Sequence, residues 1–183
     1  MDEPSPIKDI LYEQINSISE QKIQEEISKN NTSSMINQII DASYQKISQL
    51  IGNTHENFET FAESLMHYFL TNTLIPSQRK ITVKTTNIDI VIPDSRTLVS
   101  SPKDALVILF PKTDHIGTIL ESIKKLQDIQ PLKENIWIVQ KTNLGLDYKT
   151  FEIDNTRSFS NLIQNIEMFL SQKTQSKFKI FKI

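Results

Sequence analysis

The chain contains no cysteine, and this absence excludes disulfide bonds, thiolate metal sites and thiol-based catalysis. It also makes a cytosolic setting the simplest interpretation. Glycine occurs only three times in 183 residues, and the three glycines do not form a cluster. A glycine-rich, phosphate-cradling loop is therefore not expected.

Long hydrophobic runs are also missing. No apolar stretch approaches the roughly 20 residues that span a bilayer, and the first ten residues, MDEPSPIKDI, carry acids where a secretion signal needs basic residues. Neither positive nor negative residues are in clear excess, because the chain has 20 Lys and Arg and 22 Asp and Glu. The global charge therefore gives no attraction to nucleic acid or membrane. We expect a cytoplasmic protein without membrane contact.

The N-terminal part of the chain shows two amphipathic helical patterns. The segment SPIKDI predicts a helix start with proline in the first turn, and apolar residues at helical spacing continue to Ile27, where KNNTSS interrupts them. A second apolar stripe begins at Met35 and ends before Gly52. We expect a helical hairpin over residues 1–52. Because a hairpin of this size buries little surface alone, it must pack on the rest of the chain or on another copy.

The following segment, residues 53–172, changes from helical to strand patterns. A helix with a broad apolar face is predicted over Phe58–Leu70. Three successive strands are then predicted in RKITVKTT, NIDIVIPD and ALVILFPK. They are followed by a helix over His115–Gln127, a strand in NIWIVQKT, a short strand over 150–154 and a last helix from Phe159 to Leu170. This order predicts an α/β (α+β) domain with a central sheet flanked by helices.

Two of the apolar strands each contain one charged residue, Asp89 in NIDIVIPD and Lys112 in ALVILFPK. A buried charge is costly unless it is paired, hydrated or bound to a metal, so a site is expected at these positions. Strand alternation places Asp89 on the face opposite Ile88 and Ile90. It places Lys112 on the face of Phe110, where it can approach Asp89 if the two strands are hydrogen-bonded neighbours.

The element order and these residues resemble the PD-(D/E)XK nuclease superfamily, which has the restriction-endonuclease-like fold, and most closely its archaeal Holliday-junction-resolvase-type branch. The resemblance covers roughly Phe58 to Gln172. It implies that Asp89 binds Mg²⁺ and that Lys112 positions or activates the attacking water. Asp94, in the literal Pro-Asp pair, is the alternative aspartate. The carboxylate that the family carries two residues before the lysine is replaced by Phe110.

This departure decides what the resemblance can imply about catalysis. Mg²⁺ requires several oxygen ligands, and phenylalanine supplies neither a charge nor a lone pair. Asp114 beyond the lysine, and Glu59 or Glu63 on the preceding helix, would have to complete a metal site with Asp89. The alternative interpretation makes Asp89 and Lys112 an ion pair that fixes strand register, or two charges that reach solvent at strand ends.

The leading hypothesis is a catalytically degenerate nuclease-like domain without a cofactor, acting as a nucleic-acid-associated or protein-assembly module. Two alternatives stay open. One is an active Mg²⁺-dependent endonuclease or resolvase that acts on DNA. The other is a homo-oligomeric structural protein that associates through residues 1–52.

The end of the chain, residues 173–183, forms a basic tail. It contains no acid and carries four lysines, Lys173, Lys177, Lys179 and Lys182. The alternation in KFKIFKI is typical of an edge strand with a lysine face, or of a peptide that adds to another sheet. The functional alternative is a strand whose lysines contact nucleic-acid phosphates, with modest and salt-sensitive affinity.

Overall fold

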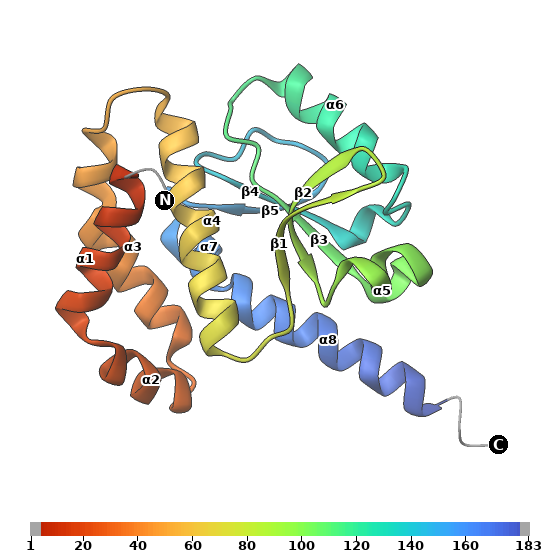
Figure 1. The fold of residues 1–183 in the computed structure, drawn as a ribbon, viewed down its shortest axis with the longest axis horizontal. Helices are drawn as coiled ribbons and strands as arrows, with labels where there is room; N and C mark the ends of the chain where they lie inside the picture. The colour runs from red at the N-terminus through yellow and green to blue at the C-terminus, as the bar shows by residue number, and fades with distance from the viewer. Residues whose placement is uncertain (1–4, 180–183) are drawn as a thin grey trace.

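The computed structural model describes residues 5–179 and contains a five-stranded sheet between two layers of helices (Figure 1). The strands are β1 (Gln78–Val83), β2 (Thr86–Ile92), β3 (Leu106–Leu109), β4 (Ile136–Gln140) and β5 (Lys149–Glu152). The α-helices are α1 (Pro6–Ile18), α2 (Glu20–Ser28), α3 (Thr32–Ser48), α4 (Thr54–Asn72), α5 (Ser95–Ser100), α6 (Ile116–Gln127), α7 (Thr156–Ser160) and α8 (Leu162–Lys179). Two 3₁₀ turns, η1 (Pro102–Asp104) and η2 (Lys133–Asn135), precede β3 and β4.

The sheet has the strand order β1-β2-β3-β4-β5. The first three strands pair antiparallel as a meander, and β3, β4 and β5 pair in parallel. Helix α6 lies in the crossover from β3 to β4, as is usual for a parallel connection. The mixed sheet with flanking helices confirms the predicted fold class.

Both faces of the sheet are covered, so the central strands have apolar side chains on both sides. Leu106, Ile108 and Phe110 join the core beneath α4, whereas Val107 and Leu109 join the core beneath α5 and α6. This division confirms the two faces predicted for the third strand. Figure 1 shows α1 to α4 on one side of the sheet and α5 and α6 on the other.

Strand β2 departs from the predicted alternation. Ile90 belongs to the core beneath α4, but Ile88 belongs to the core beneath α6. The expectation that the two share a face is therefore wrong. Residues Ile81 and Arg79 of β1 pair with Ile88 and Ile90, while Lys80 between them has a φ of +50°. The left-handed backbone conformation of Lys80 interrupts the strand pairing beside Asp89 and changes the faces to which the neighbouring side chains point.

The first predicted helix is in fact two helices. Ser19 has a φ of +76° and ends α1, and its side-chain oxygen accepts a hydrogen bond from the backbone N–H of Lys22 in the first turn of α2. The apolar spacing continues across this break, which is why the pattern alone does not show it. Helices α1, α2 and α3 share one continuous buried core with α4, α8 and the sheet, through residues such as Ile15, Ile23 and Ile36.

The C-terminal segment is helical as far as the structure describes it. Helix α8 continues to Lys179, so the edge-strand interpretation of KFKIFKI is wrong for its first three residues. Leu162, Ile166 and Phe169 form an apolar stripe that packs the first part of α8 against the core. The first residues of the tail continue this same helix. Lys182 lies outside the described residues. Within residues 5–179, no helix is long and apolar enough to cross a membrane.

Candidate functional site

Helix α4 presents two glutamates to the interior of the molecule. Asn53 caps the helix by accepting hydrogen bonds from the backbone N–H groups of His55 and Glu56, at 2.9 and 3.3 Å. Glu59 and Glu63 lie one turn apart and therefore on one face of the helix. Both have no solvent exposure. Two buried carboxyl groups in a core helix require partners from the sheet.

Those partners form a charge cluster of four residues, Glu63, Arg79, Asp89 and Lys112. Arg79 in β1 donates through Nε to Glu63 Oε1 at 2.6 Å. The Nζ of Lys112 lies 2.7 Å from Glu63 Oε2 and 3.6 Å from Asp89 Oδ1. Asp89 Oδ2 accepts a hydrogen bond from the backbone N–H of Phe110 at 2.7 Å. The predicted approach of Lys112 to Asp89 is thus present, with Glu63 as a closer partner.

The pKa values of the cluster follow from burial and from these pairings. Burial disfavours the charged form of Glu63, but the Lys112 ammonium and the Arg79 guanidinium outweigh it and hold the pKa below its usual range. Burial raises the pKa of Asp89, and Lys112 offsets this only in part. For Lys112, burial acts against the ammonium, but Asp89 and Glu63 together raise the pKa. Two carboxylates and two cations close the cluster at zero net charge.

Glu59 has a different role, because its oxygens accept backbone hydrogen bonds. One oxygen accepts from the N–H of Lys112, and the other accepts from the N–H of Lys141 at 3.1 Å. These two lysines follow β3 and β4, so the carboxyl group joins the ends of two neighbouring parallel strands to α4. Burial raises the pKa of Glu59 to about 7 in spite of these bonds.

The backbone at Lys112 explains how this residue meets both glutamates. Strand β3 ends at Leu109, and Lys112 has a φ of +60°, which a residue with a side chain rarely adopts. The turn directs its N–H to Glu59 and its ammonium to Glu63. Strained residues persist where their surroundings fix them, and here two buried carboxyl groups do so.

A cleft of about 340 Å³ opens onto the exposed side of this cluster. Its lining includes Asp89 and Lys112, together with Asn87 from β2 and Ser122 and Lys125 from α6. The side chains of Lys112 and Asp89 are 29% and 21% exposed. Glu59 and Glu63 do not line the cleft. A solute in the cleft therefore meets the ammonium of Lys112 and the carboxylate of Asp89, with the glutamates behind them.

The other residues proposed from the sequence lie elsewhere. Asp114 is exposed, and its carboxylate faces the ring of His55 at 3.7 Å. Asp94 caps α5 by accepting a hydrogen bond from the N–H of Thr97 at 2.7 Å. Lys173 lies over the ring of Phe169, 5.1 Å from its centroid, on α8. Lys177 and Lys179 follow it on the same helix.

The acidic residues of the cluster do not fit a Mg²⁺ site as they stand. No group of three or more His, Asp or Glu side chains is placed to hold a metal within residues 5–179. Phe110 is among the residues that line the cleft, but it is only 2% exposed, belongs to the core beneath α4 and offers no side-chain oxygen to a metal ion. Asp89 and Glu63 are neutralised by Lys112 and Arg79, so a divalent ion would have to displace a cation that is already bound.

Sequence reasoning missed two basic residues of the site, Arg79 and Lys141. Arg79 is the first residue of the predicted strand RKITVKTT, and a basic residue at a strand end is usually interpreted as facing solvent. Lys141 directly follows the buried strand IWIVQ, just as Lys112 follows ILFP. A basic residue just after a buried parallel strand is the sequence feature from which Lys141 could have been identified as part of the site. The side chain of Lys141 binds both oxygens of Asp154, at 2.8 and 3.0 Å.

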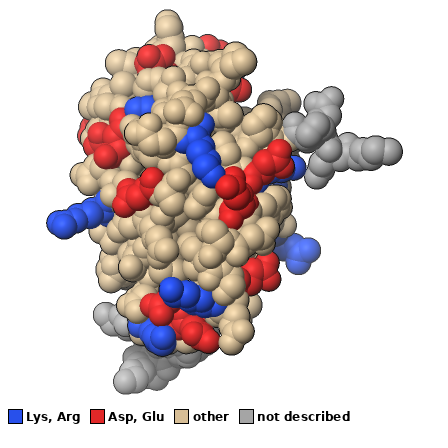
Figure 2. Space-filling view, turned by 90° about the vertical axis from the view of Figure 1, so that its left-hand side faces the viewer, with Lys and Arg blue, Asp and Glu red and all other residues tan. Residues whose placement is uncertain are grey.

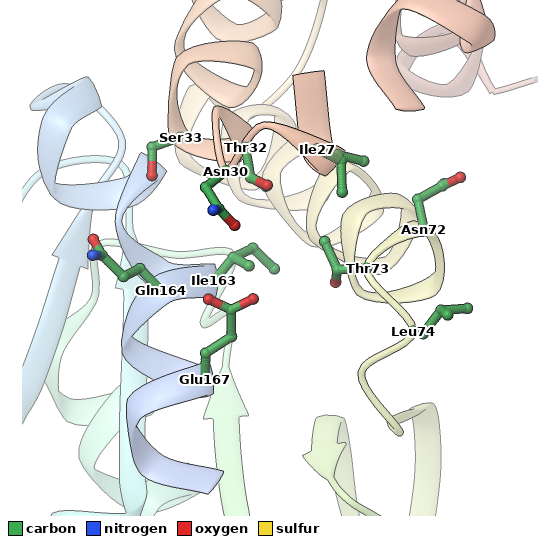
Figure 3. Close-up of a pocket in the computed structure, with 10 residues that line it drawn as sticks. All are labelled: Ile27, Asn30, Thr32, Ser33, Asn72, Thr73, Leu74, Ile163, Gln164 and Glu167. Carbon is green, nitrogen blue, oxygen red and sulfur yellow. The ribbon is translucent and has the colours of Figure 1, made fainter. Parts of the chain in front are cut away.

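A larger hollow, of about 440 Å³, lies away from the charge cluster and shares no lining residue with the cleft (Figure 3). It lies between the α2–α3 turn, the end of α4 and the start of α8. Its lining is mostly amide and hydroxyl groups, and Glu167 is the one charged residue among those that line it.

The face formed by the N-terminal helices carries acidic and basic side chains scattered among uncharged ones (Figure 2).

Comparisons with known proteins give one result that bears on the fold. No family model matches the chain, and no curated protein sequence matches it. A solved structure described as the restriction endonuclease PspGI in complex with its substrate DNA is similar, with a TM-score of 0.60 and 13% sequence identity. The match covers 92% of this chain and 94% of that chain.

The extent of this match corrects one boundary. At 92% coverage only about 15 of the 183 residues are left outside, so the aligned part extends well into the N-terminal helices and does not begin at Phe58. With the mixed sheet and the flanking helices, the similarity shows that this chain has the restriction-endonuclease-like fold.

Proposed function

We propose that the protein is a catalytically degenerate nuclease-like domain that binds nucleic acid through the cleft at Asp89 and Lys112 without cleaving it. The observation that carries this proposal is the position of Lys112 Nζ, 2.7 Å from Glu63 and 3.6 Å from Asp89. The lysine occupies the space between the two carboxylates that metal-dependent cleavage would require for an ion.

Loss of cleavage is supported by the local chemistry. Phosphodiester hydrolysis by a metal ion needs a bound hydroxide and a positive centre next to the developing charge. Here the third-strand carboxylate is absent because Phe110 takes its position. Glu63 and Asp89 already have cationic partners, and Glu59 accepts two backbone hydrogen bonds. The nearest exposed acid beyond the lysine, Asp114, faces His55 instead.

Retention of nucleic-acid binding is supported by the cleft itself. Lys112 and Lys125 line it, together with hydroxyl and amide groups of Thr85, Asn87 and Ser122. These are the group types that contact phosphate oxygens without reading sequence. The similar solved structure is a DNA complex, which gives the same fold a precedent for binding DNA. The protein's net charge of −2 means that such binding must come from this local patch.

Association of copies through residues 1–52 has less support. The apolar residues of α1, α2 and α3 are largely consumed by the chain's own core. The large apolar side chains exposed in this part of the described chain are Tyr12 and Ile51, which are 57% and 101% exposed. Assembly with a different protein stays an alternative role for the same domain.

The binding proposal can be tested with two neighbouring lysines of α6. Lys125 lines the cleft and Lys124 does not, and both are exposed. In fluorescence anisotropy titrations with labelled single-stranded and duplex DNA, we expect Lys125→Met to weaken binding roughly threefold to tenfold and to reduce the salt slope by about 1. The matched variant Lys124→Met should change the affinity less than twofold. Equal losses in the two variants, or no measurable binding by the unmodified protein, would contradict a binding role for the cleft.

A further inference from the structure

The cleft at Asp89 and Lys112 is small and is lined from two sides. Thr85 and Asn87, from the β1–β2 turn and the start of β2, line one side, and Ser122 of α6 lines the other. Its volume of about 340 Å³ is at the lower end of the roughly 300–1,000 Å³ of small-molecule sites. A space of this size admits one nucleotide, whereas a base-paired segment is too large for it.

The charges inside the cleft are already paired with one another. Lys112 Nζ lies 2.7 Å from Glu63 and 3.6 Å from Asp89, so this ammonium adds no net charge that would draw a phosphate inward. The Asp89 carboxylate is 21% exposed, and it repels phosphate oxygens but accepts N–H donors. The apolar residues of the lining are Leu109, Phe110, Pro111 and Leu126. The interior therefore suits the base and sugar of a nucleotide better than its phosphate.

Uncharged hydrogen-bonding groups along the strand side of the cleft are free to meet a base. Asn87 is exposed, and its Oδ1 accepts a hydrogen bond from the hydroxyl of Thr82 at 2.9 Å. The amide N–H donors of Asn87 have no partner within residues 5–179, and neither does the hydroxyl of Thr85. Amide and hydroxyl groups recognise the edges of bases. Unpaired bases offer these edges, whereas pairing occupies them in a duplex.

Cations for the phosphates are exposed on both sides of the cleft. Lys125 of α6 pairs with Glu121, and the side chains of this pair are 63% and 68% exposed. An exposed ion pair is weak, so a phosphate can replace the glutamate. Lys84, directly before Thr85, is exposed and has no acidic partner within the described residues. Each side of the cleft therefore has a lysine for the phosphates that flank an inserted nucleotide.

We propose that the cleft binds one unpaired nucleotide of a single strand, with the base inside and the flanking phosphates at Lys84 and Lys125. It therefore selects single-stranded over duplex nucleic acid. This inference rests on the proposed function, because it specifies which nucleic acid the same cleft binds. A duplex reaches only the mouth of the cleft, since inserting one of its nucleotides would require a base pair to open.

A comparison of DNA forms tests this selection. In anisotropy titrations at one salt concentration, we expect a labelled single strand to bind about tenfold more tightly than a blunt duplex of the same sequence. A duplex with a single-stranded overhang should bind like the single strand. Equal affinities for the single strand and the blunt duplex would overturn the inference. If Lys125→Met still weakened both, the proposed function would stand, whereas no binding of any form would contradict both.

A bulkier side chain in the cleft gives a test with a matched control. Ser122 and Ser100 are helix residues whose hydroxyl groups donate to the backbone carbonyl four residues earlier, at 3.1 and 2.9 Å. Of the two, Ser122 lines the cleft and Ser100 does not. We expect Ser122→Met to occupy the cleft and to weaken single-strand binding about tenfold, with less than about a twofold effect on the blunt duplex. Ser100→Met should change neither affinity.

A second variant removes a donor and adds no bulk. Asn87→Ala deletes the free amide group, so it should weaken single-strand binding roughly threefold to tenfold and leave the blunt duplex unaffected. Because Asn87 is exposed, this variant keeps the test valid if Ser122→Met unfolds, which circular dichroism would show. Unchanged single-strand affinity in the folded variants, or equal losses for both DNA forms, would overturn the inference.

Discussion

At the scale of single residues, the molecule is governed by buried charges that neutralise one another. Glu63 has no exposure, and its carboxylate is bound by Arg79 and Lys112. A buried charge becomes costly once a partner is removed, because the remaining group loses both water and its counter-charge. The approach of Asp89 to Lys112 could be predicted from adjacent strands. Arg79 could not, because its role depends on which helix lies over β1.

Removal of the Glu63 charge should be strongly destabilising. We expect Glu63→Gln to lower the free energy of unfolding by roughly 3 kcal/mol, since it leaves the Arg79 and Lys112 cations facing a neutral amide. Urea denaturation measures this change. Glu121→Gln breaks the exposed pair of Glu121 and Lys125 on α6 and should cost less than about 0.5 kcal/mol. Similar costs for the two variants would contradict the dominance of the buried cluster.

Glu59 should make stability depend on pH. Its pKa is about 7 in the folded protein against 4.5 in the reference state, so folded molecules bind the proton more tightly than unfolded ones. The carboxyl therefore destabilises the fold progressively as pH rises from about 4.5 to 7, by up to about 3 kcal/mol.

A comparison of the wild type with Glu59→Gln isolates this effect. The amide does not titrate, although it leaves one backbone donor less well satisfied at every pH. We expect the stability of the variant relative to the wild type to increase between pH 4.5 and 7, as measured by urea denaturation at each pH. A difference that stays constant across this range would show that Glu59 does not titrate there.

At the scale of elements, α4 is the helix that assembles the site, because it places Glu59 and Glu63 at its buried contact with the sheet. Its cap, Asn53, holds two N–H groups of the first turn. The existence of this helix, of the strand meander and of α6 followed from apolar periodicity. The break at Ser19 and the helical course of residues 173–179 did not, because each depends on a backbone angle or on packing that a period cannot show.

Replacement of the α4 cap gives a prediction at this scale. We expect Asn53→Ala to lower the free energy of unfolding by about 1 kcal/mol, and Asn53→Gly to lower it by only a few tenths of that. The capping hydrogen bonds are lost in both, but glycine leaves the helix end accessible to water. Thermal unfolding followed by circular dichroism ranks the stabilities of the wild type and the two variants. An alanine variant as stable as the wild type would show that the cap does not stabilise α4.

At the scale of the whole molecule, the N-terminal helices and the sheet form one hydrophobic core. Ile36, Ile39 and Ile40 of α3 are fully or almost fully buried in the same cluster as Phe58 and Phe61 of α4. Length and pattern predicted that residues 1–52 need a packing partner. The sequence alone left open whether this partner is the same chain or another copy, because an apolar stripe does not identify the surface that covers it.

Truncation tests this description. Deleting residues 1–52 would expose the apolar face of α4, so we expect the remaining chain to lose cooperative unfolding and near-UV circular dichroism while it retains part of its helical signal. A fragment of residues 53–183 that unfolds cooperatively, with a stability near that of the full chain, would show that the N-terminal helices are an independent addition.

We propose that Lys112 takes the place of a metal ion between Asp89 and Glu63. The most direct measurement is a calorimetric titration with Mn²⁺, combined with an assay for cleavage of single-stranded, duplex and branched DNA at the same metal concentrations. We expect no saturable binding at millimolar Mn²⁺ and no cleavage products. Saturable binding together with DNA cleavage, both abolished by Asp89→Asn, would contradict it.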